Sequence, residues 1–480
     1  MKNEDDQPVV LTHIDSNSNN DLNNGSLTSP VSLAEPFAAN LNVVSQVDVP
    51  PNGGYGWVCT ACVFLINAHT WGVNSTQAWG IFLSHYLQNS TFPGTSQFSY
   101  AIIGGLGIAC ACLVSPAVNV SMRLYGTTVT LTIGTILVFL SLFTASYASR
   151  IWHLFLSQAV CFGCGMGFTY IPATAVLPQW FSTRRSLAVG IAASGVGFGG
   201  VAYNLIAGAA AQSVGLPWTY RILALCSLAV NGVCSLLIRD RNKLVKPKQD
   251  AFDWRELGHI EVIFVIVWGF LSELGYVVLF YSLPHYATTI GLSQSQGSVA
   301  GALLNVGIGV GRPLVGWMSD RWGRINMAAL MTASCGICCL ALWVPAKDYG
   351  TLIAFALLAG FGAGNFWGTV SSVMAEVVGL QRLPTAFGVM MIVLASPTTF
   401  AEPIALEMTA VSGYKAAQIF VGFMFIGAAG SVWFLRSWKI TEIEEKAKHE
   451  EAGDFEWGLS RFHAGKAWLE PRKLIKRCRV

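Results

Sequence analysis

The chain has 480 residues, of which 53% are hydrophobic and 11% are charged. Soluble globular proteins carry roughly 25% charged residues, so this composition excludes a soluble globular protein and indicates an integral membrane protein. The formal net charge of +3 predicts neither nucleic acid nor an acidic macromolecule as a partner.

The first stretch, residues 1–54, is rich in Asn, Ser, Asp and Pro and poor in aromatic residues. Such a segment buries too little apolar area to fold alone, so we expect a disordered cytosolic tail. It contains no basic start followed by an apolar core, and we therefore expect no cleaved signal peptide.

Apolar runs of about 20 residues then recur, each long enough to cross a hydrocarbon core of roughly 30 Å. They predict an all-α membrane protein with twelve transmembrane helices at about 56–82, 98–120, 127–147, 152–177, 185–208, 219–238, 259–284, 296–318, 326–345, 351–375, 385–406 and 414–436. The order of the runs predicts two six-helix bundles, 55–238 and 257–437, a basic cytosolic linker at 239–256 and a charged cytosolic tail at 438–480.

Basic residues are distributed unevenly between alternate loops. With a cytosolic N-terminus, the inner loops hold the basic linker and Arg123, Arg184, Arg185, Arg321, Arg324 and Arg382. The outer loops hold only Arg150, Arg221, Lys347 and Lys415. This asymmetry follows the positive-inside rule, so we expect both termini in the cytosol.

The stretch from Asn305 to Arg324 combines an apolar helix with one internal arginine, Arg312. A cation inside a hydrophobic span costs several kcal/mol unless it faces a cavity or a partner, so it marks a substrate or ion path. The polar turn that follows reads Gly-x-x-x-Asp-Arg-x-Gly-Arg and comprises Gly316, Asp320, Arg321, Gly323 and Arg324. It resembles the loop signature of the major facilitator superfamily of transporters, which implies a gate that clamps a helix end to its neighbour in one transport state.

Three further motifs resemble the monocarboxylate-transporter family. The run Asn52-Gly53-Gly54-Tyr55-Gly56-Trp57 resembles the motif that opens the first helix, with Asn52 where the family has an acid. Residues 180–190 match the pattern before the fifth helix, and residues 378–388 match the one before the eleventh. Residues 71–74, Trp-Gly-Val-Asn, are most similar to the fungal branch. The resemblance implies two bundles around a central cavity and alternating access, often of small carboxylates with a proton. In it, Arg184 and Arg185 are topology and gating charges.

Arg312 followed by Pro313 matches the arginine–proline pair of helix eight in that family, where the arginine is the anion partner. A guanidinium holds a carboxylate bidentately and stays charged when buried. The alternative is a structural ion pair with a carboxylate such as Glu273. Animal members also use an acid one turn earlier and a lysine in helix one, where this chain has Ile308 and Ser75. Their proton-coupling mechanism is therefore not carried over.

Other polar residues inside predicted helices are candidates for binding or coupling. Glu273 and His69 are candidates for proton coupling, and His69 also for substrate binding; their alternatives are a salt bridge and a hydrogen-bonded packing residue. Glu402 replaces a residue that is usually proline in the family, and we interpret it as an interfacial acid. The remaining cavity candidates are Asn74, Tyr170, Asn204, Tyr281, Asn305, Asn365 and Trp367.

No run gives a phosphate-binding loop, an H-E-x-x-H motif or a G-x-S-x-G motif, so we expect neither an ATP-driven pump nor an enzyme. Cys161 and Cys164 have redox spacing but lie in an apolar run, and we interpret them as packing residues. We expect no cofactor or metal; the expected partners are a small-molecule substrate and the lipid bilayer, with a monomer as the transport unit. Asn89 begins a glycosylation sequon.

Two alternatives to an organic-anion transporter stay open. One is transport of riboflavin or another neutral metabolite, favoured by the missing lysine and acid. The other is a membrane sensor that binds without transport. The plasma membrane is the expected location, with the vacuolar membrane as the alternative.

Overall fold

The computed structural model describes residues 50–74, 92, 97–451, 469, 471–476 and 478–480. The chain divides into a segment of residues 1–48 and a compact unit of residues 49–480, and the helices below belong to the second. All regular structure in the described residues is helical, which confirms the predicted all-α fold.

The N-terminal half contains α2 (Tyr55–His69), α3 (Trp71–Asn74), α5 (Gln97–Leu113), α6 (Ser115–Ala145), α7 (Ile151–Leu154), the π-helix η1 (Phe155–Cys161), α8 (Phe162–Trp180), α9 (Arg185–Ser213), α10 (Leu216–Leu237) and α11 (Asn242–Val245). The C-terminal half contains the 3₁₀-helix η2 (Trp254–Gly258), α12 (Ile260–Thr289), α13 (Gln294–Trp322), α14 (Arg324–Cys338), the π-helix η3 (Cys339–Trp343), α15 (Tyr349–Ala363), α16 (Asn365–Ser412), α17 (Tyr414–Glu451) and α18 (Pro471–Ile475).

Two of these helices contain a sharp break at a glycine with positive φ. Gly126 in α6 has φ 81° and Gly379 in α16 has φ 77°, a backbone region that residues with a Cβ rarely adopt. Ten described stretches are long and apolar enough to cross a membrane, and one of them, residues 349–412, is 64 residues long. This stretch comprises α15 and α16 and contains the break at Gly379, and Ile102–Leu113 is a shorter apolar helix. By length and composition, the described helices agree with the expected multi-pass membrane fold.

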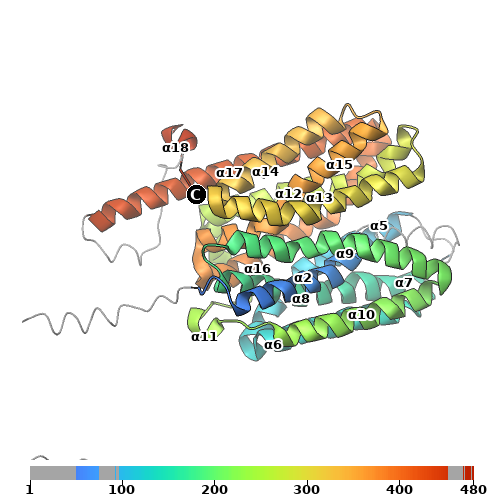
Figure 1. The fold of residues 1–480 in the computed structure, drawn as a ribbon, viewed down its shortest axis with the longest axis horizontal. Coiled ribbons are helices and arrows are strands. Elements are labelled where there is room, and N and C mark those ends of the chain that lie inside the picture. Colours follow the sequence, from blue (N-terminus) through green and yellow to red (C-terminus); the bar gives the residue numbers. More distant parts are fainter. Residues whose placement is uncertain (1–49, 75–91, 93–96, 452–468, 470, 477) are drawn as a thin grey trace, which may run out of the picture. The chain divides into compact units, whose positions relative to one another are not determined.

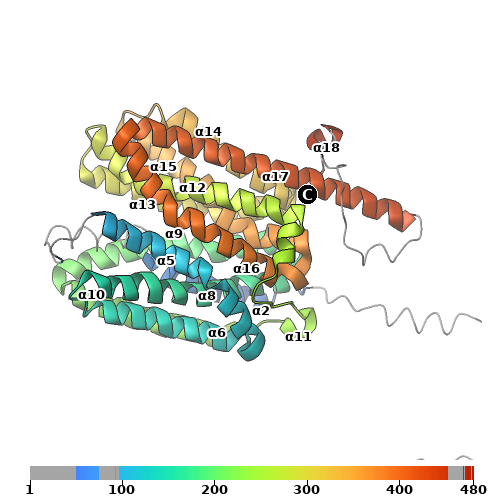
Figure 2. The ribbon, with the colours of Figure 1, turned by 180° about the vertical axis from the view of Figure 1, so that it is seen from behind.

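The helices of each half pack mainly among themselves, and the halves meet along two seams. On one seam α9 lies against α13, and on the other α5 lies against α16. Figures 1 and 2, which view the protein from opposite sides, show these two pairs side by side. Four long helices therefore carry the boundary between the halves.

The α9–α13 seam is a close approach of two backbones. A Cβ added to Gly190 would lie 2.3 Å from the carbonyl oxygen of Arg312, and one added to Gly316 would lie 2.3 Å from that of Ser186. Only glycine fits such contacts, and small residues are the usual means by which membrane helices pack closely. The seam brings the backbone of Arg312 directly against the opposite half.

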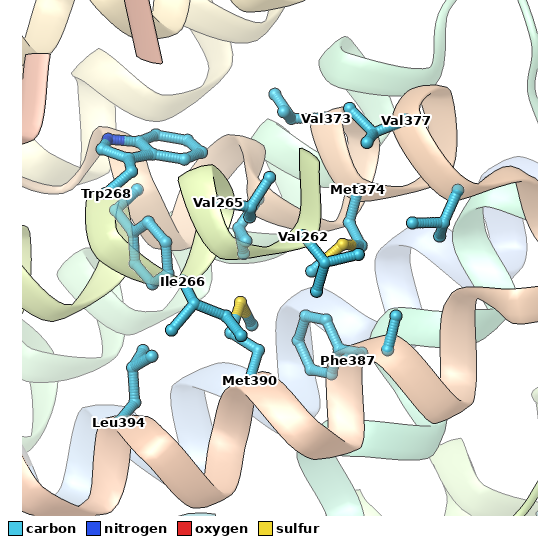
Figure 3. Packing of buried hydrophobic residues seen from close by; sticks show 14 of the residues in the cluster. Val262, Val265, Ile266, Trp268, Val373, Met374, Val377, Phe387, Met390 and Leu394 are labelled. Carbon is cyan, nitrogen blue, oxygen red and sulfur yellow. The ribbon is translucent and has the colours of Figure 1, made fainter. Parts of the chain in front are cut away.

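Buried apolar side chains fix α16 to α12. Figure 3 shows Val265 and Ile266 of α12 close to Met374 and Met390 of α16. Next to them the fully buried Trp268 ring meets Phe366 edge-to-face at 4.9 Å. Its indole N–H donates to the Thr332 hydroxyl of α14 at 3.1 Å, which satisfies the one polar atom of this ring. These contacts hold the first turn of α16, which contains Phe366, against α12.

Candidate functional site

A cavity of about 80 Å³ lies between the two halves. A single water requires roughly 10–15 Å³, so the space suits several waters or a small solute. The cavity is lined from the N-terminal half by Asn67, Trp71, Ile108, Tyr170, Ala193 and Val196, and from the C-terminal half by Glu273, Tyr276, Val277, Phe280, Tyr281, Asn305, Arg312 and Trp367.

Arg312 is buried in the cavity wall, with 4% of its surface exposed. Its Nε donates to the Gly364 carbonyl at 3.1 Å, and its Nη1 donates to the Ala193 carbonyl of the opposite half at 2.6 Å. The side chain lies in a slot without Cβ atoms, since a Cβ on Gly368 would lie 3.1 Å from its Cγ. Two backbone carbonyls thus accept hydrogen bonds from the guanidinium. A guanidinium has five N–H groups, so the others stay available.

Glu273 lies in the same wall with 2% of its surface exposed. It interacts electrostatically with Arg312, but the two side chains form no ion pair among the contacts of the described residues, so the structural pair considered from sequence is not present. Its carboxyl group also interacts with the side chain of Trp367. The oxygen Oε1 is buried and has no hydrogen-bond partner in the described part of the chain.

Two buried amides add further polar atoms to the lining. Asn67 donates through Nδ2 to the Ala192 carbonyl at 2.9 Å, and Asn305 donates through Nδ2 to the Gly301 carbonyl at 3.2 Å. The Oδ1 atoms of both amides have no partner in residues 50–74 and 97–451 or the other described positions. Asn305 was a candidate from sequence, whereas Asn67 was not.

Three aromatic rings from both halves form one side of the cavity. The centroids of Trp71 and Tyr170 are 5.4 Å apart, those of Trp71 and Trp367 are 6.0 Å apart, and those of Tyr170 and Trp367 are 5.8 Å apart. The indole N–H of Trp71 is buried and finds no acceptor among the described residues. The rings meet at interplanar angles of 35° to 79° and provide an apolar wall, and Trp71 adds a hydrogen-bond donor.

At one end of the halves, Asp320 of α13 binds the first turn of α9. Its carboxylate accepts hydrogen bonds from the backbone N–H of Ser186 at 3.0 Å and of Leu187 at 2.8 Å. Arg324 donates to Asp320 at 3.4 Å and to Glu376 at 3.0 Å. Arg324 also donates to the Ser182 carbonyl. We call these six residues, Ser182, Ser186, Leu187, Asp320, Arg324 and Glu376, the Asp320 cluster.

Other predicted gate residues lie around this cluster. Gly323 has φ 100° and forms the turn between α13 and α14. Arg321 instead points outward, with its guanidinium 4.0 Å from the centroid of the Trp317 ring. Arg185 donates to the Phe181 carbonyl at 2.9 Å, and Arg184 is exposed. The cluster therefore includes Asp320 and Arg324 but none of these three arginines.

Asn52 supports the same end of the molecule. Its Oδ1 accepts hydrogen bonds from the backbone N–H of Ser182 at 2.7 Å and of Thr183 at 2.9 Å. An acid at this position would accept the same two bonds. The amide therefore fixes the loop before α9, from which Ser182 joins the Asp320 cluster.

The last described residues fold back onto this end. The Val480 carbonyl accepts hydrogen bonds from the backbone N–H of Ile325 at 3.1 Å and of Asn326 at 3.2 Å. The Asn326 side chain donates to the Cys478 carbonyl at 2.8 Å and accepts from Arg436 Nε at 2.6 Å. With 2% of Val480 exposed, the segment from 478 to 480 is seated beside the Asp320 cluster.

The structure separates the sequence candidates into groups. Arg312, Glu273, Asn305, Tyr170, Tyr281 and Trp367 line the cavity. Asn365 instead donates to the Ala328 carbonyl at 3.3 Å, and His69 bonds the Leu65 carbonyl at 2.8 Å; neither belongs to the lining. The side chains of Asn74 and Asn204 lie outside the described residues, as do Ser75 and Asn89. Glu402 is also not among the lining residues. Its Oε2 atom is buried and has no hydrogen-bond partner within the described chain.

Sequence reasoning missed Asn67, Trp71, Tyr276 and Phe280. Asn67 carried a usable signal, because an amide inside an apolar helix needs a partner just as a charge does. Tyr276 lies one turn after Glu273 on α12, so helical spacing places both side chains on one face. For Trp71 the local pattern of apolar residues gave no such indication.

Comparisons with known proteins agree with this architecture. The family model for the Major Facilitator Superfamily matches residues 56–346 and 265–477. The "Probable transporter MCH2" of Saccharomyces cerevisiae is 32% identical over 424 residues, which cover 86% of this chain and 89% of that protein. The "Uncharacterized transporter ESBP6" of the same yeast is 32% identical over 438 residues, covering 86% of this chain and 64% of that protein. A crystal structure of a double-tryptophan mutant of XylE aligns with a TM-score of 0.65 at 14% identity, over 80% of this chain and 96% of XylE.

Proposed function

The chain belongs to the major facilitator superfamily and is a multi-pass membrane transporter, and from this premise we propose that it moves a small organic anion, such as a monocarboxylate, by alternating access. Arg312 is the proposed anchor for the anion. The wall of the cavity comes from both halves, which is the arrangement that a rocking motion of the halves requires.

One observation carries the proposal: a single guanidinium is buried in a cavity between the halves, without an ion pair among the described residues. A buried cation costs several kcal/mol, and such residues in transporters mark the substrate path. Two backbone carbonyls compensate only part of its charge. A carboxylate entering the cavity supplies the missing countercharge and accepts bidentately from the free N–H groups.

The test is uptake into vesicles that contain the purified protein, with a panel of radiolabelled carboxylates. We expect saturable uptake that Arg312→Gln lowers at least tenfold. Arg221→Gln is the matched control, because this arginine stacks on Tyr147 and Trp218 and is not among the residues that line the cavity. Equal carboxylate uptake by Arg312→Gln and by the unmodified protein would remove Arg312 as the anchor.

Coupling and orientation extend the proposal. Glu273 is the proposed proton-coupling residue, supported by its place in the cavity and its unpartnered oxygen. Both termini are proposed to lie in the cytosol, which the charge asymmetry of the loops supports. The proposed location of the protein is the plasma membrane. The Asp320 cluster then closes the cytosolic end. A proton gradient should drive uptake, and Glu273→Gln should abolish that dependence while Glu402→Gln retains it.

A neutral, flat metabolite such as riboflavin is the second candidate. Three aromatic rings around one side of the cavity favour it, because aromatic surfaces stack on flat ring systems. The same vesicles distinguish the two substrates. Flavin uptake that is insensitive to pH and to protonophores, with no carboxylate uptake, would replace the anion proposal.

A further inference from the structure

The cavity lining contains three buried acceptors without a partner among the residues that the structure describes, beside the N–H groups of Arg312 that stay available. Within the described chain, Glu273 Oε1, Asn67 Oδ1 and Asn305 Oδ1 are buried without a hydrogen-bond partner, whereas Trp71 Nε1 is the corresponding donor. Each of the three oxygens belongs to a side chain that is at most 2% exposed. Leaving such a group unpaired costs about 1–3 kcal/mol, so the set favours a molecule that brings N–H or O–H donors.

The orientation of both amides follows from their hydrogen bonds. Asn67 and Asn305 each direct the nitrogen to a backbone carbonyl, at 2.9 Å and 3.2 Å. Rotating either amide by 180° would place its oxygen against that carbonyl, where neither atom can donate. The amide oxygens therefore stay without a partner in the described structure, and the three unpartnered acceptors are a property of the site.

Charge adds a second, independent constraint. Arg312 is a cation and Glu273 is an acid that can lose a proton to become an anion, and both line the same cavity. A ligand with only a carboxylate can satisfy the guanidinium, but it brings no donor for the three oxygens. A ligand with only an ammonium group leaves the guanidinium without its countercharge. A ligand that carries both a carboxylate and an ammonium group satisfies the guanidinium and the three unpartnered oxygens.

We infer that the substrate is a small zwitterion, a 2-amino carboxylic acid, with its carboxylate on Arg312 and its ammonium group on Glu273, Asn67 and Asn305. An ammonium group has three N–H donors, one for each unpartnered oxygen. The rings of Trp71, Tyr170 and Trp367 add a surface that favours a cation. This inference rests on the proposed function and narrows its substrate class to carboxylates that also carry an ammonium group.

Matched substrates test the inference on the full-length protein in vesicles. Propionate, lactate and alanine share one carbon frame and carry hydrogen, hydroxyl or ammonium at carbon 2; the corresponding benzyl series covers a larger side chain. We expect the amino member of at least one series to be taken up at least tenfold faster than its unsubstituted acid. Alaninamide, which keeps the ammonium group but lacks the carboxylate, should not be transported.

The outcomes separate this inference from the proposed function. Uptake of the unsubstituted acids that equals or exceeds that of the amino acids, and that depends on Arg312, overturns the inference and leaves anion transport standing. Uptake of alaninamide at the rate of alanine also overturns it, because the carboxylate is then not recognised. Absence of uptake for every carboxylate overturns both proposals.

The ratio of alanine uptake to lactate uptake does not depend on how much protein folds, because both rates are measured on the same preparation. This ratio therefore makes the variants comparable. Asn305→Leu removes one acceptor at similar volume, and we expect the alanine-to-lactate uptake ratio to fall at least fivefold. Asn365→Leu is the control, since that amide is equally buried but bonds within the C-terminal half. An unchanged ratio in Asn305→Leu, or the same fall in Asn365→Leu, contradicts an ammonium site at these oxygens.

Discussion

Replacing Asp320 with asparagine tests how the two halves are held at one end. In the structure the carboxylate accepts from two backbone N–H groups in the first turn of α9, at 3.0 and 2.8 Å. Asparagine keeps one acceptor oxygen, loses the charge, and turns an NH₂ group towards the other N–H. The variant therefore removes one of these bonds and weakens the second.

The size of the effect follows from these contacts. A hydrogen bond to a charged group contributes about 1.5–3 kcal/mol, and an anion at a helix N-terminus adds about 0.3–1 kcal/mol. The closed arrangement should lose about 2–4 kcal/mol relative to an open one. At roughly 1.4 kcal/mol per factor of ten, the ratio of closed to open molecules falls about 30- to 1000-fold.

Double electron–electron resonance measures this ratio directly. Genetically encoded spin labels at Leu124 and Trp322, exposed positions on the two halves, should show a longer-distance population in Asp320→Asn. Arg321→Gln is the control, because it removes a neighbouring charge that stacks on Trp317 outside the Asp320 cluster. An unchanged distance distribution in Asp320→Asn, or an equal shift in the control, refutes the reasoning.

Three further predictions concern packing, the linker and the last residues. Gly190→Ala places a methyl group 2.3 Å from a backbone carbonyl of α13, so we expect at least tenfold lower uptake, whereas Gly232→Ala, with open space around its Cα, should transport normally. Arg382→Ala leaves the buried Glu256 carboxylate without its 2.5 Å ion-pair partner; a loss of about 3–5 kcal/mol should lower the melting temperature in detergent by several degrees, and no change would contradict this ion pair. Asn326→Ala removes the hydrogen bond to the seated last residues, so the backbone N–H groups of residues 325 and 326, which donate to the Val480 carbonyl, should exchange with deuterium at least tenfold faster; unchanged exchange would mean that other contacts hold the last residues.

Much of the fold could be predicted because a chain that crosses lipid must satisfy its own backbone hydrogen bonds, which favours helices. Apolar runs of about 20 residues locate the crossings, and the regular structure of the described residues is helical as expected. Their ends were less certain. The helix before Gly126 continues to the glycine itself, because a helix remains the best way to satisfy backbone groups until a residue allows positive φ.

The site could be predicted only in part, because sequence distance does not report which backbone atoms face a side chain. Arg312 was identifiable from the cost of burying its charge, but its partners are the carbonyls of Ala193 and Gly364, which no side-chain pattern reveals. Similarly, Arg321 and Arg324 share one motif, yet they lie at different angles around the α13–α14 turn and face different surroundings. Asn67 and Asn305 come from different halves, and only the three-dimensional structure shows that both line one cavity and each has an oxygen unpartnered among the described residues.

The Arg312 guanidinium of α13 holds the opposite half through its hydrogen bond to the Ala193 carbonyl. If Arg312 anchors the proposed anion, a bound carboxylate competes with this carbonyl for the same guanidinium while it supplies another countercharge. Under that proposal, the loaded molecule should change between its two states more readily than the unloaded one. The expected consequence of this one side chain is a carrier with little uncoupled movement.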